Sequence, residues 1–219
     1  MAKSKFGESQ VIDFFSTALK DELINRFGSH SQYSIGNFSG GQDRKYADFF
    51  AGTNSSCILI EFKEFEREIR DEYRKPLREK LCKNLTSETA ALSRTTHFIA
   101  HRISSMCMDI KLSPYVDVVC PNWSIGSPPL EAVSSKAHYD FIDDFLSGKE
   151  GVVIGKFLQY AGHLSSTAGG TADGANAPFK SVLYSRNTQG RVVGTFFNSL
   201  GELRQLIDKA PKITQSRRP

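Results

Sequence analysis

Residues 57–65 read CILIEFKEF, and this stretch decides how the rest of the chain is interpreted. Side chains alternate across a β-strand, so a run this apolar predicts a strand that is buried on both faces. One face carries Ile58, Ile60 and Phe62, and the other carries Cys57, Leu59, Glu61 and Lys63. Burying an unpaired charge costs several kcal/mol, and even a buried ion pair often only breaks even. Glu61 and Lys63 on an inner face therefore indicate a functional reason.

A divalent cation would supply that reason, because a carboxylate bound to Mg2+ is no longer an uncompensated charge. A single carboxylate makes a weak Mg2+ site, so a second acid is expected nearby. Asp48 is the candidate, since twelve residues separate it from Glu61. That length suits the rest of one strand, a turn and half of the next strand running back. A hairpin would thus bring Asp48 beside Glu61, with Lys63 on the same face.

The pattern Asp48-x12-Glu61-x-Lys63 resembles the PD-(D/E)XK nuclease superfamily. The matching residues are Ala47-Asp48 and Glu61-Phe62-Lys63, with Ala47 where the family has a proline that is not a ligand. The expected element order, helix and then three strands, agrees with the core of that family over roughly residues 9 to 100. The resemblance implies an α/β, restriction-endonuclease-like core, with a central mixed β-sheet flanked by helices. A C-terminal hairpin-plus-helix extension is expected to follow this core.

The resemblance also implies roles for these residues. Asp48 and Glu61 would hold Mg2+, for which Mn2+ would substitute, and the metal would activate water for attack on a phosphodiester. Lys63 would orient the nucleophile or stabilise the charge that develops on the phosphate. Many members of the family add an acid from the first helix, and Glu22 and Glu8 are the options here. Either one fits equally well as a solvated helix acid.

The remaining pattern predicts one domain over 1–219, with a core at about 9–125, an extension at about 126–210 and a frayed tail at 211–219. The charged run 64–80 is expected to form a helix that Pro76 kinks or splits in two, with one buried apolar stripe and its charges in solvent. Other helices are expected at 9–27, 87–94, 135–146, 152–164 and 201–210. Strands are expected at 32–38, 45–51, 96–103, 115–123, 181–187 and 191–198, and a flexible segment at 165–178.

Weaker candidates remain outside this motif. Lys156 and Gln159 lie on an expected helix of a kind that holds DNA in some members of the family, although they also suit the surface of a packed helix. His97 and His101 have the spacing of a zinc pair on a helix, but the flanking Thr95 and Thr96 favour a strand instead.

Composition sets broad limits on function. The chain has 219 residues, 39% of them hydrophobic and 24% charged, and a net charge of +4, which permits nucleic-acid binding without demanding it. No segment has the length and apolarity of a membrane span. The four cysteines form no CxxC pair, which favours unpaired cysteines in a reducing, cytoplasmic compartment.

These observations predict a metal-dependent nuclease that acts on nucleic acid, most readily DNA. Three alternatives stay open. In the first, the chain is a catalytically inactive module of the same fold that binds nucleic acid or a protein. In the second, Glu61 and Lys63 form a structural pair at a strand end. In the third, the nuclease is a defence effector against phage that a protein partner activates. The lack of a recognisable recognition domain favours such a partner or a homodimer.

Overall fold

A computed structural model describes residues 7–28, 32–38, 41–122, 134–187, 189 and 191–209. Its centre is an eight-stranded mixed sheet with the order β6-β5-β4-β3-β2-β1-β7-β8. Only β3 and β4 pair in parallel among the described strands, and every other neighbouring pair is antiparallel. The strands are β1 Tyr33–Asn37, β2 Phe49–Thr53, β3 Cys57–Phe65, β4 His97–Arg102, β5 Ile110–Pro114, β6 Lys136–Ala137, β7 Pro178–Arg186 and β8 Val192–Ser199.

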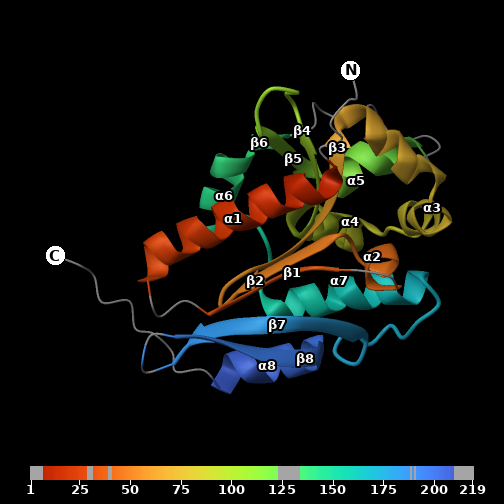
Figure 1. Ribbon diagram of the computed structural model, residues 1–219. Helices are drawn as coiled ribbons and strands as arrows, with labels where there is room; N and C mark the ends of the chain where they lie inside the picture. Colours follow the sequence, from red (N-terminus) through yellow and green to blue (C-terminus); the bar gives the residue numbers. More distant parts are fainter. Residues whose placement is uncertain are drawn as a thin grey trace.

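Helices cover both faces of this sheet (Figure 1). The first face packs against α1 (Glu8–Phe27) and α6 (His138–Leu146). The second packs against α3 (Pro76–Lys83), α4 (Ser87–Thr96), α5 (Tyr115–Val119), α7 (Ile154–Thr167) and α8 (Leu200–Lys209). Short elements complete the chain, namely α2 (Gly41–Lys45) and the 3-10 helices η2 (Glu66–Arg74) and η3 (Cys120–Asn122). The coarse expectation of an α/β protein with a mixed sheet between helices is confirmed.

The strand β3 lies near the middle of the sheet, and its alternation follows the sequence. Ile58, Ile60 and Phe62 join the apolar cluster beneath α1 and α6. Cys57 and Leu59 join the cluster beneath α7. Glu61 and Lys63 belong to this second face, and both are buried. The expected helix at 9–27 is also confirmed, and it ends at Gly28, whose φ of 59° is a conformation that glycine adopts without a steric penalty.

The expected strand at 115–123 is wrong. The described part of it, 115–122, forms α5 and η3, while the strand that pairs with β4 is β5, at Ile110–Pro114. The β-branched valines of this segment favour a strand locally. The helical conformation lets Tyr115, Val116 and Val119 bury one side against the sheet, and that burial outweighs the local preference.

The charged run at 64–80 splits at Pro76 as expected, because proline at the first position of α3 needs no amide donor. The expectation that its charges lie in solvent is wrong for two of them. Glu72 is fully buried, and Arg78 is 2% exposed. The first half is a 3-10 helix, in which residues three apart share a side, so Ile69 and Glu72 both turn inward.

The C-terminal extension packs into the same hydrophobic core as the residues that precede it. The hairpin β7–β8 is present as expected, and β7 pairs with β1, so the hairpin lengthens the same sheet. Phe179, Leu183 and Phe197 belong to the apolar cluster beneath α7. The segment expected to be flexible begins within α7, which runs to Thr167. Further on, Gly174 lies so close to α7 that a Cβ there would be 1.9 Å from the Leu158 carbonyl oxygen.

The expectation of four unpaired cysteines is also wrong. Cys82 at the end of α3 and Cys120 in η3 form a disulfide, whereas Cys57 and Cys107 are free. Disulfides are typical of oxidising compartments, so cysteine usage no longer supports the cytoplasmic prediction. Within the described part of the chain, no helix combines the length and apolarity needed to cross a membrane.

Candidate functional site

The site begins with the pairing of β2 and β3, in which Phe49 lies opposite Ile60. Asp48 directly precedes β2, so this register places it opposite Glu61. It was expected within a strand, and it lies instead at the bend just before one. The carboxylate of Asp48 accepts a hydrogen bond of 2.7 Å from the backbone N–H of Phe62. The hairpin thus fixes Asp48 against the strand that carries Glu61 and Lys63.

The ammonium of Lys63 is the point at which carboxylates from four elements or their flanks converge. Its Nζ lies 3.0 Å from Glu61, 3.2 Å from Glu72, 3.5 Å from Glu8 and 4.0 Å from Asp48. It also donates a hydrogen bond of 2.6 Å to the Phe62 carbonyl oxygen. The structure therefore brings Asp48, Glu61 and Lys63 together, and it adds Glu8 from the start of α1.

Two further cations approach from the run after β3. Lys75 Nζ lies 2.8 Å from Glu61 and 2.6 Å from Glu72. Arg78 lies 3.1 Å from the other Glu61 oxygen and 3.5 Å from Glu72. The Tyr115 hydroxyl of α5 donates a hydrogen bond of 3.0 Å to Glu72. We call this group the carboxylate–cation cluster, and it consists of Glu8, Asp48, Glu61, Lys63, Glu72, Lys75 and Arg78.

Electrostatics keep the centre of the cluster ionised. Burial alone would raise the pKa of Glu61, but Arg78, Lys63 and Lys75 outweigh it and hold the pKa well below its usual range. Burial likewise disfavours the charged form of Lys63, yet the surrounding carboxylates, led by Glu61, raise its pKa. Glu61 is therefore a carboxylate and Lys63 an ammonium throughout the physiological pH range.

The edge of the cluster is short of positive charge. Burial, followed by repulsion from Glu61, raises the pKa of Asp48 to about 7. Burial also raises the pKa of Glu8, although Lys63 opposes this shift. The cluster contains four carboxylates against three cations, so one negative charge is uncompensated when all of them ionise. The raised pKa values locate this deficit at Asp48 and Glu8.

The donor set fits a hard cation in type and charge, since Mg2+ prefers carboxylate oxygens and the deficit lies at Asp48 and Glu8. Both oxygens of Glu61 already contact protein cations. Among the described residues, no three acidic, histidine or cysteine side chains form a ready-made metal site. Asp48, Glu61 and Glu8 are thus the residues that would hold Mg2+, in competition with the ion pairs of Lys63 and Lys75.

Other sequence candidates lie elsewhere. Glu22 sits fourteen residues beyond Glu8 on α1, which corresponds to roughly 20 Å along a helix, and it pairs with Arg26. Lys156 and Gln159 occupy the exposed side of α7, away from its buried face.

His97 and His101 are strand residues on β4, as expected. The ring of His97 stacks on Tyr115 at 4.3 Å and contacts the Tyr160 hydroxyl at 3.0 Å. Burial and then Arg78 lower the pKa of His97 to about 3, so its imidazole is neutral and structural.

Sequence reasoning missed Glu72, Lys75, Arg78 and Tyr115. The available signal was a spacing of three, since Ile69, Glu72, Lys75 and Arg78 recur at every third position. A 3-10 helix places such residues on one side, and the spacing carries over Pro76 into the first turn of α3. The apolar stripe with a spacing of four concealed this pattern. For Tyr115, no local signal points to Glu72, because its position depends on α5.

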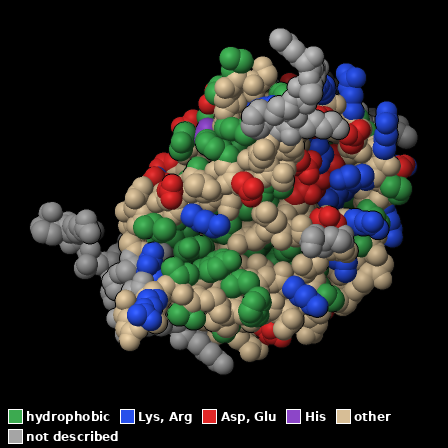
Figure 2. Space-filling model, in the orientation of Figure 1, with side chains coloured by type: hydrophobic (Ala, Val, Ile, Leu, Met, Phe, Trp, Pro, Cys, Tyr) green, Lys and Arg blue, Asp and Glu red, His purple; other side chains and the backbone are tan. Residues whose placement is uncertain are grey.

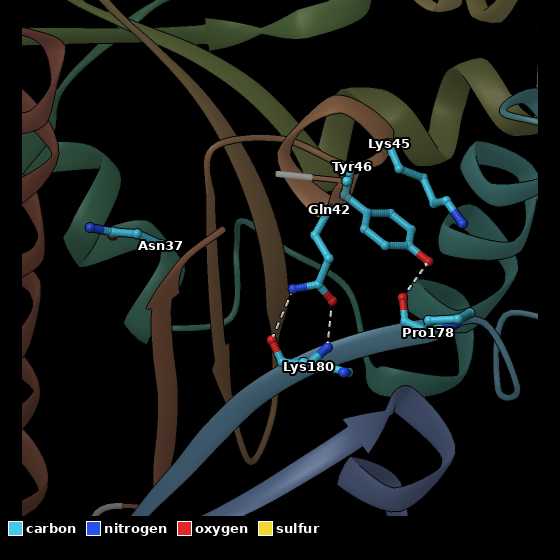
Figure 3. A pocket seen from close by; sticks show the side chains of 7 residues that line it. Asn37, Gln42, Lys45, Tyr46, Pro178 and Lys180 are labelled. Atoms are coloured by element: carbon cyan, nitrogen blue, oxygen red, sulfur yellow. Dashed lines mark hydrogen bonds between the residues drawn. The ribbon is translucent and has the colours of Figure 1, made fainter. Parts of the chain in front are cut away.

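A cavity of about 670 Å³ opens between the end of β1, α2 and the start of β7 (Figure 3). The side chain of Gln42 accepts from the N–H and donates to the carbonyl of Lys180, as a neighbouring strand would. The Tyr46 carbonyl oxygen accepts from Arg78, which joins the cavity wall to the carboxylate–cation cluster. The lining contains two lysines and no acid, namely Asn37, Gly41, Gln42, Lys45, Tyr46, Pro178 and Lys180.

Comparison of the chain with models of known protein families, with curated proteins and with solved structures found no significant match.

Proposed function

We propose that this protein is a Mg2+-dependent nuclease with a restriction-endonuclease-like fold, which hydrolyses phosphodiester bonds, most readily in DNA. One observation carries the proposal. Asp48, Glu61 and Lys63 converge on one buried point at the sheet, and Glu8 from the first helix joins them. The sequence motif and the element order support the same family. A purely structural ion pair would not need two additional acids whose pKa values are raised by their position.

Each residue has a role in this proposal. Asp48, Glu61 and Glu8 hold Mg2+, which supplies an activated water and shields the charge on the phosphate. Lys63 orients the nucleophile and stabilises the negative charge that develops in the transition state. Arg78 and Lys75 act as positioning residues, because they neutralise the parts of Glu61 and Glu72 that face the core. The Phe62 N–H holds the Asp48 carboxylate in place.

The cavity beside α2 fits a phosphate group next to the cleaved one. Lys45 and Lys180 face an acid-free lining, and phosphate contacts of lysine position a nucleic acid without reading its sequence. Tyr46 in the cavity wall accepts a hydrogen bond from Arg78, and it precedes Asp48 by two residues in the sequence. We therefore assign Lys45 and Lys180 to binding of the nucleic-acid backbone, ahead of Lys156 and Gln159.

The decisive experiment is incubation of the purified protein with plasmid, linear DNA and single-stranded oligonucleotides in Mg2+, Mn2+ or EDTA. Cleavage is expected with either metal and not with EDTA. Glu61→Gln and Glu8→Gln are expected to reduce cleavage strongly. Glu22→Gln is the matched control, because it changes the other acid of α1 without touching the cluster, and it should cut normally.

The second candidate is an inactive module of the same fold that binds nucleic acid or a protein partner. Its supporting observation is that protein cations already contact both oxygens of Glu61. This candidate predicts no cleavage with any metal, and no change in the melting temperature when Mg2+ is added. A metal-dependent rise in melting temperature that Asp48→Asn abolishes would exclude it, even if a partner is needed for cleavage.

A further inference from the structure

Among the residues that the structure describes, no helix lies over one part of the sheet. The strand β8 is an edge strand, and its partner β7 connects it to β1. The apolar cluster beneath α1 and α6 includes described residues of β1 to β5 and none of β7 or β8. Only the opposite face of β8 is covered, where Phe197 packs with residues of α8. None of the described helices therefore covers the face of β7 and β8 that is turned toward the side of α1.

This open face carries large aromatic and aliphatic side chains. Phe196 is 81% exposed, and Val192 on the same face of β8 is 55% exposed. The register places Phe196 opposite Val182 and Tyr184 opposite Tyr33, whose rings lie 5.5 Å apart. Figure 2 shows apolar side chains spread over this part of the sheet, below α1. We call Val182, Tyr184, Val192 and Phe196 the open sheet face, and Tyr33 borders it, partly buried against the apolar cluster beneath α1.

Positive charge is concentrated in the C-terminal part of the sequence, which includes this hairpin. Residues 174–219 contain eight lysines and arginines and two acids, whereas residues 1–173 contain twenty bases and twenty-two acids. Within 174–201 there are three bases and no acid at all, namely Lys180, Arg186 and Arg191. The net charge of +4 thus comes entirely from the hairpin segment and the residues C-terminal to it. An apolar face flanked by these basic residues is complementary to a polyanion that also presents flat apolar surfaces.

We propose that the open sheet face binds single-stranded nucleic acid, with bases stacked on Phe196 and Tyr184 and with the backbone near the basic residues of the hairpin. Unpaired bases offer an exposed ring face to aromatic side chains, whereas the bases of a duplex stack on one another. A second copy of the chain is a poorer occupant, because it would bring two positively charged hairpins together. This inference deepens the proposed nuclease function by naming the substrate class.

The test is fluorescence anisotropy of a labelled oligo-dT of about twenty nucleotides, titrated with the full-length protein in EDTA at low salt. Binding is expected for the natural sequence. Phe196→Ser and Tyr184→Ser are each expected to weaken it on the order of ten-fold or more. The control is Tyr139→Ser, since Tyr139 is 64% exposed on α6, far along the sheet order from β8, and its loss should leave affinity unchanged. Circular dichroism melts verify that each variant folds.

Because no metal is present, the result is independent of whether the protein cleaves its ligand. Unchanged affinity in Phe196→Ser, or no binding by the natural sequence, would overturn the inference and leave the nuclease proposal standing. Tighter binding of a duplex of the same length would overturn it as well. Light scattering provides the remaining outcome, since a dimer that Phe196→Ser dissociates, with oligonucleotide binding unaffected, would show that a second copy occupies this face.

Discussion

At the scale of residues, Lys63 contacts four carboxylates. Two of them, Glu61 and Glu72, are buried, and each has other cations beside it as well. Glu61 and Glu72 each also contact Lys75 and Arg78. Removing Lys63 therefore leaves both glutamates with cationic partners. Arg78 is different, because its side chain is 2% exposed and solvent does not reach the position of its guanidinium. The two cations thus have separable roles, since Lys63 also contacts Asp48 and Glu8, whereas Arg78 contacts only Glu61 and Glu72 among the four carboxylates in the described contacts.

We predict that Lys63→Ala reduces cleavage by about 100- to 1000-fold while lowering stability much less than Arg78→Ala does. Arg78→Ala should cost about 3–5 kcal/mol, because among the described contacts Arg78 alone places a cation on Glu61 Oε2, and that buried oxygen would be left without one. Urea denaturation and cleavage rates of both variants measure the two effects. If Lys63→Ala cuts normally and unfolds as early as Arg78→Ala, then Lys63 is a structural cation.

The pKa of Asp48 leads to a prediction for pH. Because its pKa is raised to about 7, the folded protein binds this proton more tightly than the unfolded chain does. The contribution of Asp48 to stability therefore falls as the pH rises from about 4 to about 7, where the buried group ionises. Asp48→Asn removes this effect. In EDTA, the melting temperature of Asp48→Asn minus that of the natural protein should therefore increase as the pH rises from 5 to 8. Asp140→Asn, at an exposed position, should show no such trend.

At the scale of elements, the connection between β3 and β4 supplies three of the seven residues of the cluster, namely Glu72, Lys75 and Arg78. It consists of η2, α3 and α4, and the disulfide from Cys82 to Cys120 ties the end of α3 to η3. Arg78 lies on α3 and Tyr115 on α5, which runs directly into η3, so the disulfide joins the two segments that hold Glu72. The position of the cluster thus depends on this connection as well as on the sheet.

Cys82→Ser is expected to lower the free energy of unfolding by about 2–4 kcal/mol, since the disulfide closes a loop in the unfolded chain. Cys107→Ser is the control, because Cys107 is exposed and free. Thiol titration checks the pairing itself. One thiol should react in the native protein, two after unfolding, and four after unfolding with a reductant. Four reactive thiols without a reductant would contradict the disulfide.

At the scale of the whole molecule, charge is segregated along the chain. The sequence up to residue 173 has a small excess of acids, and the hairpin with its flanks is strongly basic. The cavity with Lys45 and Lys180 adjoins the start of β7. Tyr46 in its wall accepts a hydrogen bond from Arg78, so the cavity connects the hairpin with the carboxylate–cation cluster. A nucleic acid that approaches the cluster from this side would thus meet the positive charge of the hairpin first.

Binding of a single strand should accordingly weaken steeply with salt. Each phosphate contact contributes a slope of about 0.7 in a plot of log affinity against log salt. Lys180→Ala should reduce that slope by about this amount, whereas Lys83→Ala, whose ammonium pairs with Glu79 on α3, should leave it unchanged. Anisotropy titrations at several salt concentrations measure both slopes. An affinity that hardly changes with salt would contradict an electrostatic mode of binding.

The amino-acid sequence was sufficient for the features that depend on local periodicity. CILIEFKEF specified a strand buried on both faces, with Glu61 and Lys63 on one of them, because alternation is a property of any strand. The spacing from Asp48 to Glu61 indicated a hairpin, and the structure has it. The first helix, the split at Pro76 and the final hairpin were predicted from equally local signals.

Tertiary packing was needed to show which distant residues complete the cluster. Between Glu8 and Glu22, the sequence could not choose, because both suit a helix surface and only the packing of α1 brings one of them to Lys63. Glu72 and Arg78 resembled solvated charges, since burial of a charge is set by partners on other elements rather than by its own neighbours. The helical form of 115–119 and the disulfide have the same cause, namely packing between segments that are far apart in the chain.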